Sequence, residues 1–267
     1  ALMQVNNEIG TIQPIDRLAE SAHEAGALFL CDAVQGAGKL APENTLAAFR
    51  LGAAHGYRMF ECDVKLSADD VPFLLHDATL ERTSTGHAVA GEQAWTALSQ
   101  LDVGSWHSRA YAGEALPSLA NIASFCLHNS LLLNIEIKPT PGTERHTGEV
   151  VAQHAARLWQ AAPVPPLLTS FDVAALEGAQ AAQPELPRGL LLDSLIPDWL
   201  ATAQRLGCVA IVCKHTLWDA TTVAQAKTAG LRTLSYTVND HHAAQHLLDL
   251  RTDGIITDRV DLFAPGQ

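Results

Sequence analysis

The chain has 267 residues, 48% of them hydrophobic, which is enough to bury the core of one large domain. Its 17 basic and 29 acidic residues give a net charge of −12, which argues against nucleic acids and anionic membranes as partners. No apolar run approaches the roughly 18 residues that a spanning helix needs, so we expect no integral membrane association.

Short runs of β-branched and aliphatic residues alternate with longer segments that carry apolar residues at helical spacing. The predicted strands are 27–33, 58–65, 131–138, 166–170, 188–193, 208–213, 231–238 and 254–258. The predicted helices are 43–55, 118–128, 145–161, 173–182, 197–206, 219–229 and 241–250. Eight such βα units close most simply into a barrel, so the pattern predicts an α/β protein with the (β/α)8 TIM-barrel fold.

One connection, after the second strand region, breaks this alternation. Residues 78–117 separate the apolar segment that ends at Asp77 from the next predicted helix. This is too long for an ordinary βα loop, and its large aromatic residues Trp95, Trp106 and Tyr111 need a surface to pack on. We therefore interpret 78–117 as an insertion that forms a small cap beside the active-site face.

Charged residues occupy alternate positions in two of the predicted strands. Glu61 and Asp63 share one strand face, as do Glu136 and Lys138, because residues i and i+2 point the same way. Such charges are costly inside a barrel unless a cation or a substrate compensates them. The carboxylates suit Mg²⁺ or Ca²⁺, and Lys138 suits an anionic ligand that bridges to the metal. The alternative is a buried salt-bridge network without a metal.

His76 follows the apolar run 73–75 and precedes Asp77, a carboxylate close enough to orient its ring. This arrangement is typical of a general acid or base. The alternative, an ordinary surface histidine, is the better interpretation for the other histidines of the chain. The sequence contains no G-x-S-x-G motif, P-loop or dinucleotide-binding motif, so acyl transfer, nucleotide hydrolysis and hydride transfer lack their signatures.

The five cysteines are widely spaced and include no C-x-x-C pair. This usage predicts neither a disulfide framework nor a zinc site. It is typical of a reducing compartment, so we expect a cytoplasmic protein. The oligomeric state stays open.

Several short motifs follow one another along the chain in a characteristic order. They are P-E-N-T (42–45), E-x-D (61–63), L-H-D-x-x-L-x-R-T (75–83), N-x-E-x-K (134–138), S-F-D (170–172), T-V-N (237–239) and D-G-I-I-T-D (253–258). Residues 38–267 thereby resemble the glycerophosphodiester phosphodiesterases. The resemblance implies a metal-dependent barrel of glycerol and lipid metabolism, which hydrolyses small glycerophosphodiesters to sn-glycerol 3-phosphate and an alcohol.

The resemblance also implies roles for individual residues. The metal ligands would be Glu61, Asp63 and Glu136. Lys138 would contact the phosphate, and His76 would be one of two catalytic histidines. Phe171 would flank the glycerol moiety and Asn44 would support the site, although simple packing is an equal explanation for these two. The resemblance chooses neither between Mg²⁺ and Ca²⁺ nor among substrate alcohols.

One part of the family pattern is missing. The first strand of the family ends in His-Arg-Gly, whereas the aligned residues here are Val34, Gln35 and Gly36. Valine cannot transfer a proton and glutamine cannot neutralise a phosphate; the loss of one acid–base group typically lowers a rate by roughly 10²- to 10⁴-fold. We therefore expect impaired hydrolysis. The alternative function is a non-catalytic barrel that binds a divalent cation and a glycerophosphodiester.

The segment before the barrel has a different resemblance. Residues 1–15 and 26–40 resemble a stretch of the cysteine desulfurases, whose matching residues here, Asn7, Asp32 and Gln35, would contact pyridoxal phosphate. The Schiff-base lysine of that family lies farther along, where this chain has Arg58, so no complete cofactor site is expected. We predict a desulfurase-like segment at 1–37, which supplies the first barrel strand at 27–33, and a phosphodiesterase barrel at 38–267.

Overall fold

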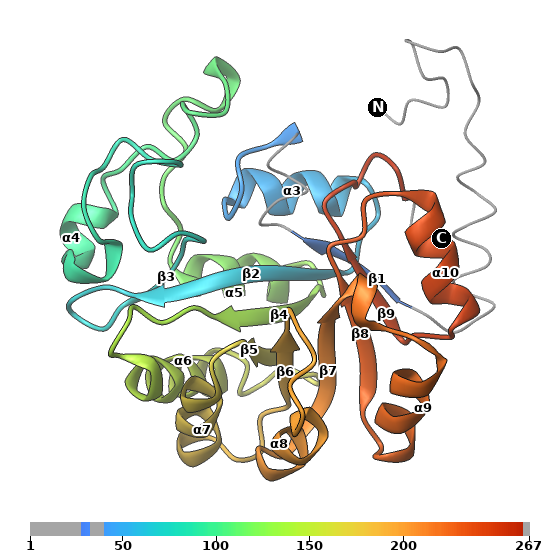
Figure 1. The fold of residues 1–267 in the computed structure, drawn as a ribbon. Coiled ribbons are helices and arrows are strands. Elements are labelled where there is room, and N and C mark those ends of the chain that lie inside the picture. The colour runs from blue at the N-terminus through green and yellow to red at the C-terminus, as the bar shows by residue number, and fades with distance from the viewer. Residues whose placement is uncertain (1–27, 33–39, 264–267) are drawn as a thin grey trace, which may run out of the picture.

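An eight-stranded parallel barrel lies at the centre of the computed structural model, which describes residues 28–32 and 40–263 (Figure 1). Its strands are β1 (Leu28–Asp32), β2 (Met59–Leu66), β4 (Leu132–Ile137), β5 (Leu167–Ser170), β6 (Arg188–Leu192), β7 (Cys208–Lys214), β8 (Arg232–Tyr236) and β9 (Gly254–Thr257). Strand β1 pairs in parallel with both β9 and β2, which closes the barrel. The predicted (β/α)8 fold is therefore confirmed.

Seven helices of the described chain connect the barrel strands and cover the outside of the barrel (Figure 1). They are α3 (Leu46–Ala54), α5 (Leu119–His128), α6 (Glu144–Leu158), α7 (Val173–Ala182), α8 (Trp199–Arg205), α9 (Ala220–Thr228) and α10 (His241–Asp249). Side-chain oxygens cap several helix starts: Asp172, for example, accepts hydrogen bonds from two backbone N–H groups of α7. None of the described helices combines the length and apolar character needed to cross a bilayer.

Successive side chains along each strand point alternately into the barrel and outward to the helices, so the protein has one core inside the barrel and another between barrel and helices. On β2 and β4, side chains such as Cys62 and Ile135 are fully buried on the outer face, in the core shared with the helices. Inside the barrel, the β6 to β9 side is filled by apolar side chains. The charged pairs of β2 and β4 occupy the other side, so the polarity of the barrel interior is divided between its two halves.

A short antiparallel strand follows β2 outside the barrel. Strand β3 (Pro72–Leu74) pairs with the end of β2, with Leu74 opposite Val64. The next residue, Leu75, donates a backbone hydrogen bond of 3.2 Å to the carbonyl of Asp63. This edge strand therefore brings the chain back to the charged face of β2 immediately before His76.

Residues 75–117 form an excursion from the barrel beside β3 (Figure 1). It contains helix α4 (Trp95–Leu98) and the 3₁₀ turns η1 (Ala90–Glu92) and η2 (Arg109–Tyr111). Its apolar side chains form a small core together with Phe73 of β3, and Trp95 packs against this core. The Tyr111 hydroxyl donates a hydrogen bond to the carbonyl of Leu40, and Trp106, which is 37% exposed, donates one from Nε1 to the carbonyl of Val103. The contact between Tyr111 and Leu40 attaches the excursion to the segment that precedes α3.

Helices α6 and α7 approach each other closely through two glycines, which leads to a stability prediction. A Cβ added at Gly148 would lie 1.9 Å from the carbonyl oxygen of Ala175. Replacing a helical glycine with alanine normally stabilises by roughly 0.5–1 kcal/mol, but Gly148→Ala is expected to destabilise by about 1–3 kcal/mol because the helices must separate. Urea unfolding measures this, with exposed Gln153→Ala on α6 as the control. A gain in stability for Gly148→Ala would contradict the close approach.

Candidate active site

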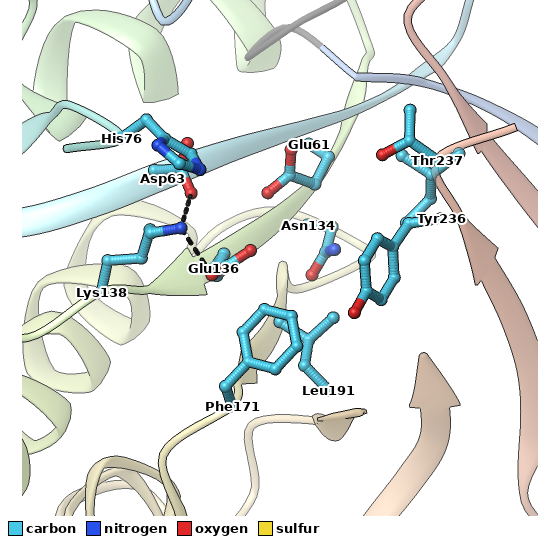
Figure 2. Close-up of a pocket in the computed structure, with 11 residues that line it drawn as sticks. Glu61, Asp63, His76, Asn134, Glu136, Lys138, Phe171, Leu191, Tyr236 and Thr237 are labelled. Carbon is cyan, nitrogen blue, oxygen red and sulfur yellow. Dashed lines mark ion pairs between the residues drawn. The ribbon is translucent and has the colours of Figure 1, made fainter. Parts of the chain in front are cut away.

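A pocket opens at the carboxyl ends of the barrel strands, with a cavity volume of about 170 Å³ (Figure 2). One wall carries the polar side chains of β2, β4 and the segment after β3. The opposite wall is formed by Phe171, Leu191, Tyr236 and Ile256. Six of the seven residues predicted for the site line this one pocket: Glu61, Asp63, His76, Glu136, Lys138 and Phe171.

Strand register brings the three carboxylates together. Strands β2 and β4 pair in parallel with Asp63 opposite Glu136, and Glu61 stands one inward-facing position earlier on β2. One oxygen atom from each carboxylate lies within 4.8 Å of the others. Glu61 and Asp63 are only 6% and 1% exposed, so their charges are costly without a compensating cation.

Lys138 lies between two of these carboxylates, as Figure 2 shows. Its Nζ is 3.4 Å from Asp63 Oδ1 and 3.3 Å from Glu136 Oε1. Burial by itself lowers the pKa of Lys138, but the charges of Asp63 and Glu136 outweigh burial and hold the pKa above its ordinary value. The ammonium group is therefore charged at neutral pH and suited to contact an anion.

Asn44 lies behind the carboxylates. Its Nδ2 donates a hydrogen bond of 3.0 Å to Asp63 Oδ2, and its Oδ1 accepts one of 3.1 Å from the Asp63 backbone N–H. Asn44 has a φ of 55°, a left-handed conformation that asparagine tolerates better than most residues. This double contact fixes the orientation of the Asp63 side chain.

His76 enters the pocket from the segment after β3. Its Nδ1 lies 2.8 Å from Asp77 Oδ1. Hydrogen bonds from Arg82, with a smaller contribution from His76, lower the pKa of Asp77 to about 2. Because Asp77 is then an ionised acceptor, the proton of this contact sits on His76 Nδ1. The neutral ring therefore keeps Nε2 as its basic nitrogen.

The apolar wall contains a pair of aromatic rings. Phe171 is 43% exposed, and its ring packs edge to face against that of Tyr236, with the centroids 5.8 Å apart. The Tyr236 hydroxyl donates a hydrogen bond of 3.0 Å to the carbonyl of Leu192, which fixes the ring at the mouth of the barrel. The wall thus offers an apolar surface opposite the charged groups.

Sequence reasoning missed several residues of this region. Tyr236, Leu191 and Asn134 line the pocket, and the inward alternation of their strands is the signal that could have found them. Lys65, two residues after Asp63, is also buried, and its Nζ donates a hydrogen bond of 3.2 Å to the carbonyl of Lys138. Burial lowers the pKa of Lys65 to about 8.

The amino-acid sequence of the chain matches two known protein families. Residues 35–262 match the glycerophosphoryl diester phosphodiesterase family. The chain belongs to this family. Residues 1–44 match a second family, the class-V aminotransferases, so the two matches overlap at 35–44.

Relatives of this phosphodiesterase cover nearly its whole barrel. Bacillus subtilis YhdW is 28% identical over 235 residues, which are 86% of this chain and 94% of YhdW. The glycerophosphodiester phosphodiesterase of Caldanaerobacter subterraneus is 27% identical over 231 residues, or 84% of this chain and 91% of the relative. A solved Oleispira antarctica phosphodiesterase, in complex with its product sn-glycerol-3-phosphate, has a TM-score of 0.81 at 29% identity, covering 90% of this chain and 96% of its own.

The departure from the family pattern at Val34 and Gln35 lies outside the described residues of this phosphodiesterase. The described strand β1 ends at Asp32, whose backbone is in register with that of Glu61 on β2. The described end of β1 therefore lies next to the strand that carries Glu61 and Asp63.

Proposed function

We propose that this chain hydrolyses glycerophosphodiesters to sn-glycerol 3-phosphate and an alcohol, that it depends on a divalent metal ion, and that its rate is reduced by Val34 and Gln35. The observation that carries the proposal is the pocket itself. It combines three converging carboxylates, a partly buried lysine and a histidine held by a carboxylate at the carboxyl end of a barrel. The product complex of the Oleispira relative supports the substrate class.

The donor set fits a hard divalent cation. Glu61, Asp63 and Glu136 would hold it, because carboxylate oxygens are the preferred protein ligands of Mg²⁺ and Ca²⁺. When bound, such an ion neutralises phosphate charge and polarises a phosphoryl oxygen. Asn44 keeps Asp63 in place for this role, as an outer partner does at many metal sites.

The other residues bind the substrate and move a proton. Lys138 is charged and contacts a phosphate oxygen, while Phe171 covers the carbon atoms of the glycerol moiety. His76 exchanges a proton at Nε2 with the attacking or the leaving oxygen, since its Nδ1 is engaged by Asp77. Phosphodiester hydrolysis needs proton transfer at both oxygens, so a chain with His76 alone is expected to be slow.

A non-catalytic role is the second candidate, and the replacements at Val34 and Gln35 favour it. In this case the barrel binds a divalent cation and a glycerophosphodiester without turnover. We propose a cytoplasmic location in either case. In the described chain, Cys126, Cys208 and Cys213 are buried cysteines outside any disulfide, which suits a reducing compartment.

A direct assay separates the two candidates. Glycerophosphocholine is incubated with the chain and Mg²⁺ or Ca²⁺, and the release of sn-glycerol 3-phosphate is measured with and without EDTA. We expect slow release that EDTA abolishes and that Glu136→Gln also removes. Release that EDTA leaves unchanged would contradict metal dependence. No release, together with metal-dependent binding of glycerophosphocholine in calorimetry, would establish the non-catalytic role.

A further inference from the structure

An arginine near the start of the 75–117 excursion links the loop that carries His76 to the loop that precedes α3. The Arg82 guanidinium donates to Asp77 through Nε and Nη2, and to Glu43 through Nη1 and Nη2. Asp77 in turn holds His76 Nδ1 at 2.8 Å. A continuous chain of charged hydrogen bonds therefore runs from Glu43 to the proposed acid–base group.

The Glu43 end of this series of hydrogen bonds is held in a buried position. Glu43 is only 7% exposed, so its carboxylate is costly to bury without the guanidinium, whose planar fork matches two carboxylates at once. Glu43 directly precedes Asn44, which holds Asp63. Arg82 thus fixes the loop behind the carboxylate cluster and the loop that carries His76 in one arrangement.

The effect on Asp77 is electrostatic as well as geometric. Without Arg82, only the smaller effect of His76 would oppose the rise in the Asp77 pKa that burial causes, and the carboxylate would lose two of its hydrogen bonds. If the Asp77 carboxylate can rotate, its hydrogen bond to His76 Nδ1 is weaker and favours the Nδ1–H tautomer less. The consequence for His76 is a mixture of Nδ1–H and Nε2–H forms.

We propose that Arg82 is a positioning residue, which acts through Asp77 to hold His76 with its proton on Nδ1, and that Glu43 acts by fixing Arg82. The inference rests on the proposed function only in giving His76 the proton-transfer role. The hydrogen-bond geometry on which it depends is independent of any substrate.

The first test observes His76 directly. Imidazole ¹⁵N chemical shifts of histidine-labelled protein are recorded at alkaline pH, with His76→Asn to assign the signal. We expect the Nδ1–H tautomer in the parent and a mixed tautomer in Arg82→Gln and in Arg82→Gln/Glu43→Gln. The double variant leaves no unpaired buried charge, so it guards against misfolding. An unchanged His76 signal in the folded double variant would overturn the proposal.

The matched control is Arg205→Gln. Arg205 is also exposed and paired with a carboxylate, Glu177, but on the outer helices. It is expected to leave the His76 signal unchanged. The tautomer measurement needs no turnover, so it tests the role of Arg82 separately from the proposed function. If the tautomer of His76 changes in the Arg82 variants but the parent shows no hydrolysis, the positioning role is supported and the proposed hydrolysis is refuted.

The second test is kinetic and uses the Val34→His/Gln35→Arg background. Arg82→Gln is expected to lower kcat by roughly 10- to 100-fold with little change in KM, since the loss of an orienting partner affects proton transfer. Arg82→Lys, which can pair with one carboxylate at a time, is expected to recover part of this loss. Adding Glu43→Gln to Arg82→Gln should cause no further fall. If the two substitutions lower kcat independently and additively, Glu43 does not act through Arg82.

Discussion

Hydrolysis of glycerophosphocholine by the Val34→His/Gln35→Arg variant is expected to exceed that of the unmodified chain by roughly 10²- to 10⁴-fold. The introduced histidine supplies the second proton-transfer group, and the introduced arginine supplies a cation for the phosphate. The described parts of the site, from the carboxylates to His76, require no change. The measurement is kcat/KM in saturating Mg²⁺ or Ca²⁺, with metal-free protein as the blank.

The single variants Val34→His and Gln35→Arg serve as controls, as does a triple variant that also carries His76→Asn. Adding His76→Asn to the double variant should remove the gain, because proton transfer at one of the two oxygens is lost again. Equal activity of the parent and the double variant would show that the first strand does not limit the rate. If neither chain hydrolyses the substrate, the remaining pocket is insufficient for catalysis and the binding role is favoured.

The second large effect concerns Asp63. Saturating Mg²⁺ or Ca²⁺ is expected to stabilise the parent by about 2.7 kcal/mol at a concentration 100 times Kd, because the ion binds only the folded carboxylate cluster. Asp63→Asn should weaken this binding by roughly 100-fold or more, since the loss of an outer partner alone costs 10- to 100-fold. Asparagine keeps the side-chain shape and an oxygen for Asn44 Nδ2. Thermal unfolding and calorimetry measure both quantities.

An exposed carboxylate at the other end of the barrel provides the matched control. Glu185 lies in the connection between α7 and β6, opposite the carboxyl ends of the strands, and Glu185→Gln should leave metal binding unchanged. If the parent gains no stability from either cation, the alternative without a metal holds. In that case the ion pairs with Lys138 offset the charge of Asp63 and Glu136.

The sequence was sufficient for the fold because the relevant signals are local. Apolar runs of strand length and segments of helical periodicity repeat along the chain, and each is visible without knowledge of its neighbours. The parallel barrel then follows because few arrangements bury eight βα units. The short antiparallel β3 beside β2 escaped this reasoning, since three apolar residues do not distinguish an edge strand from the end of a barrel strand.

For the proposed site too, part of the arrangement followed from the sequence and part from the tertiary structure. Two-residue periodicity alone indicated that Glu61 and Asp63 share a face, as do Glu136 and Lys138. Only strand register decided that Asp63 stands opposite Glu136, so that these pairs converge. The roles assigned to them remain predictions for the experiments above.

Arg82 shows where sequence reasoning ended. The motif that contains it was recognised, but its bridge to Glu43 joins residues 39 positions apart and depends on how two loops pack. The apolar wall depends likewise on strands far apart in the chain, β5 and β8, which the barrel brings to one mouth. By itself the sequence determined the barrel and the charged strand faces, because each is a property of neighbouring residues, and its resemblance to the family located the missing His-Arg pair. The tertiary structure alone decided which side chains meet, because those contacts depend on the closure and register of the barrel.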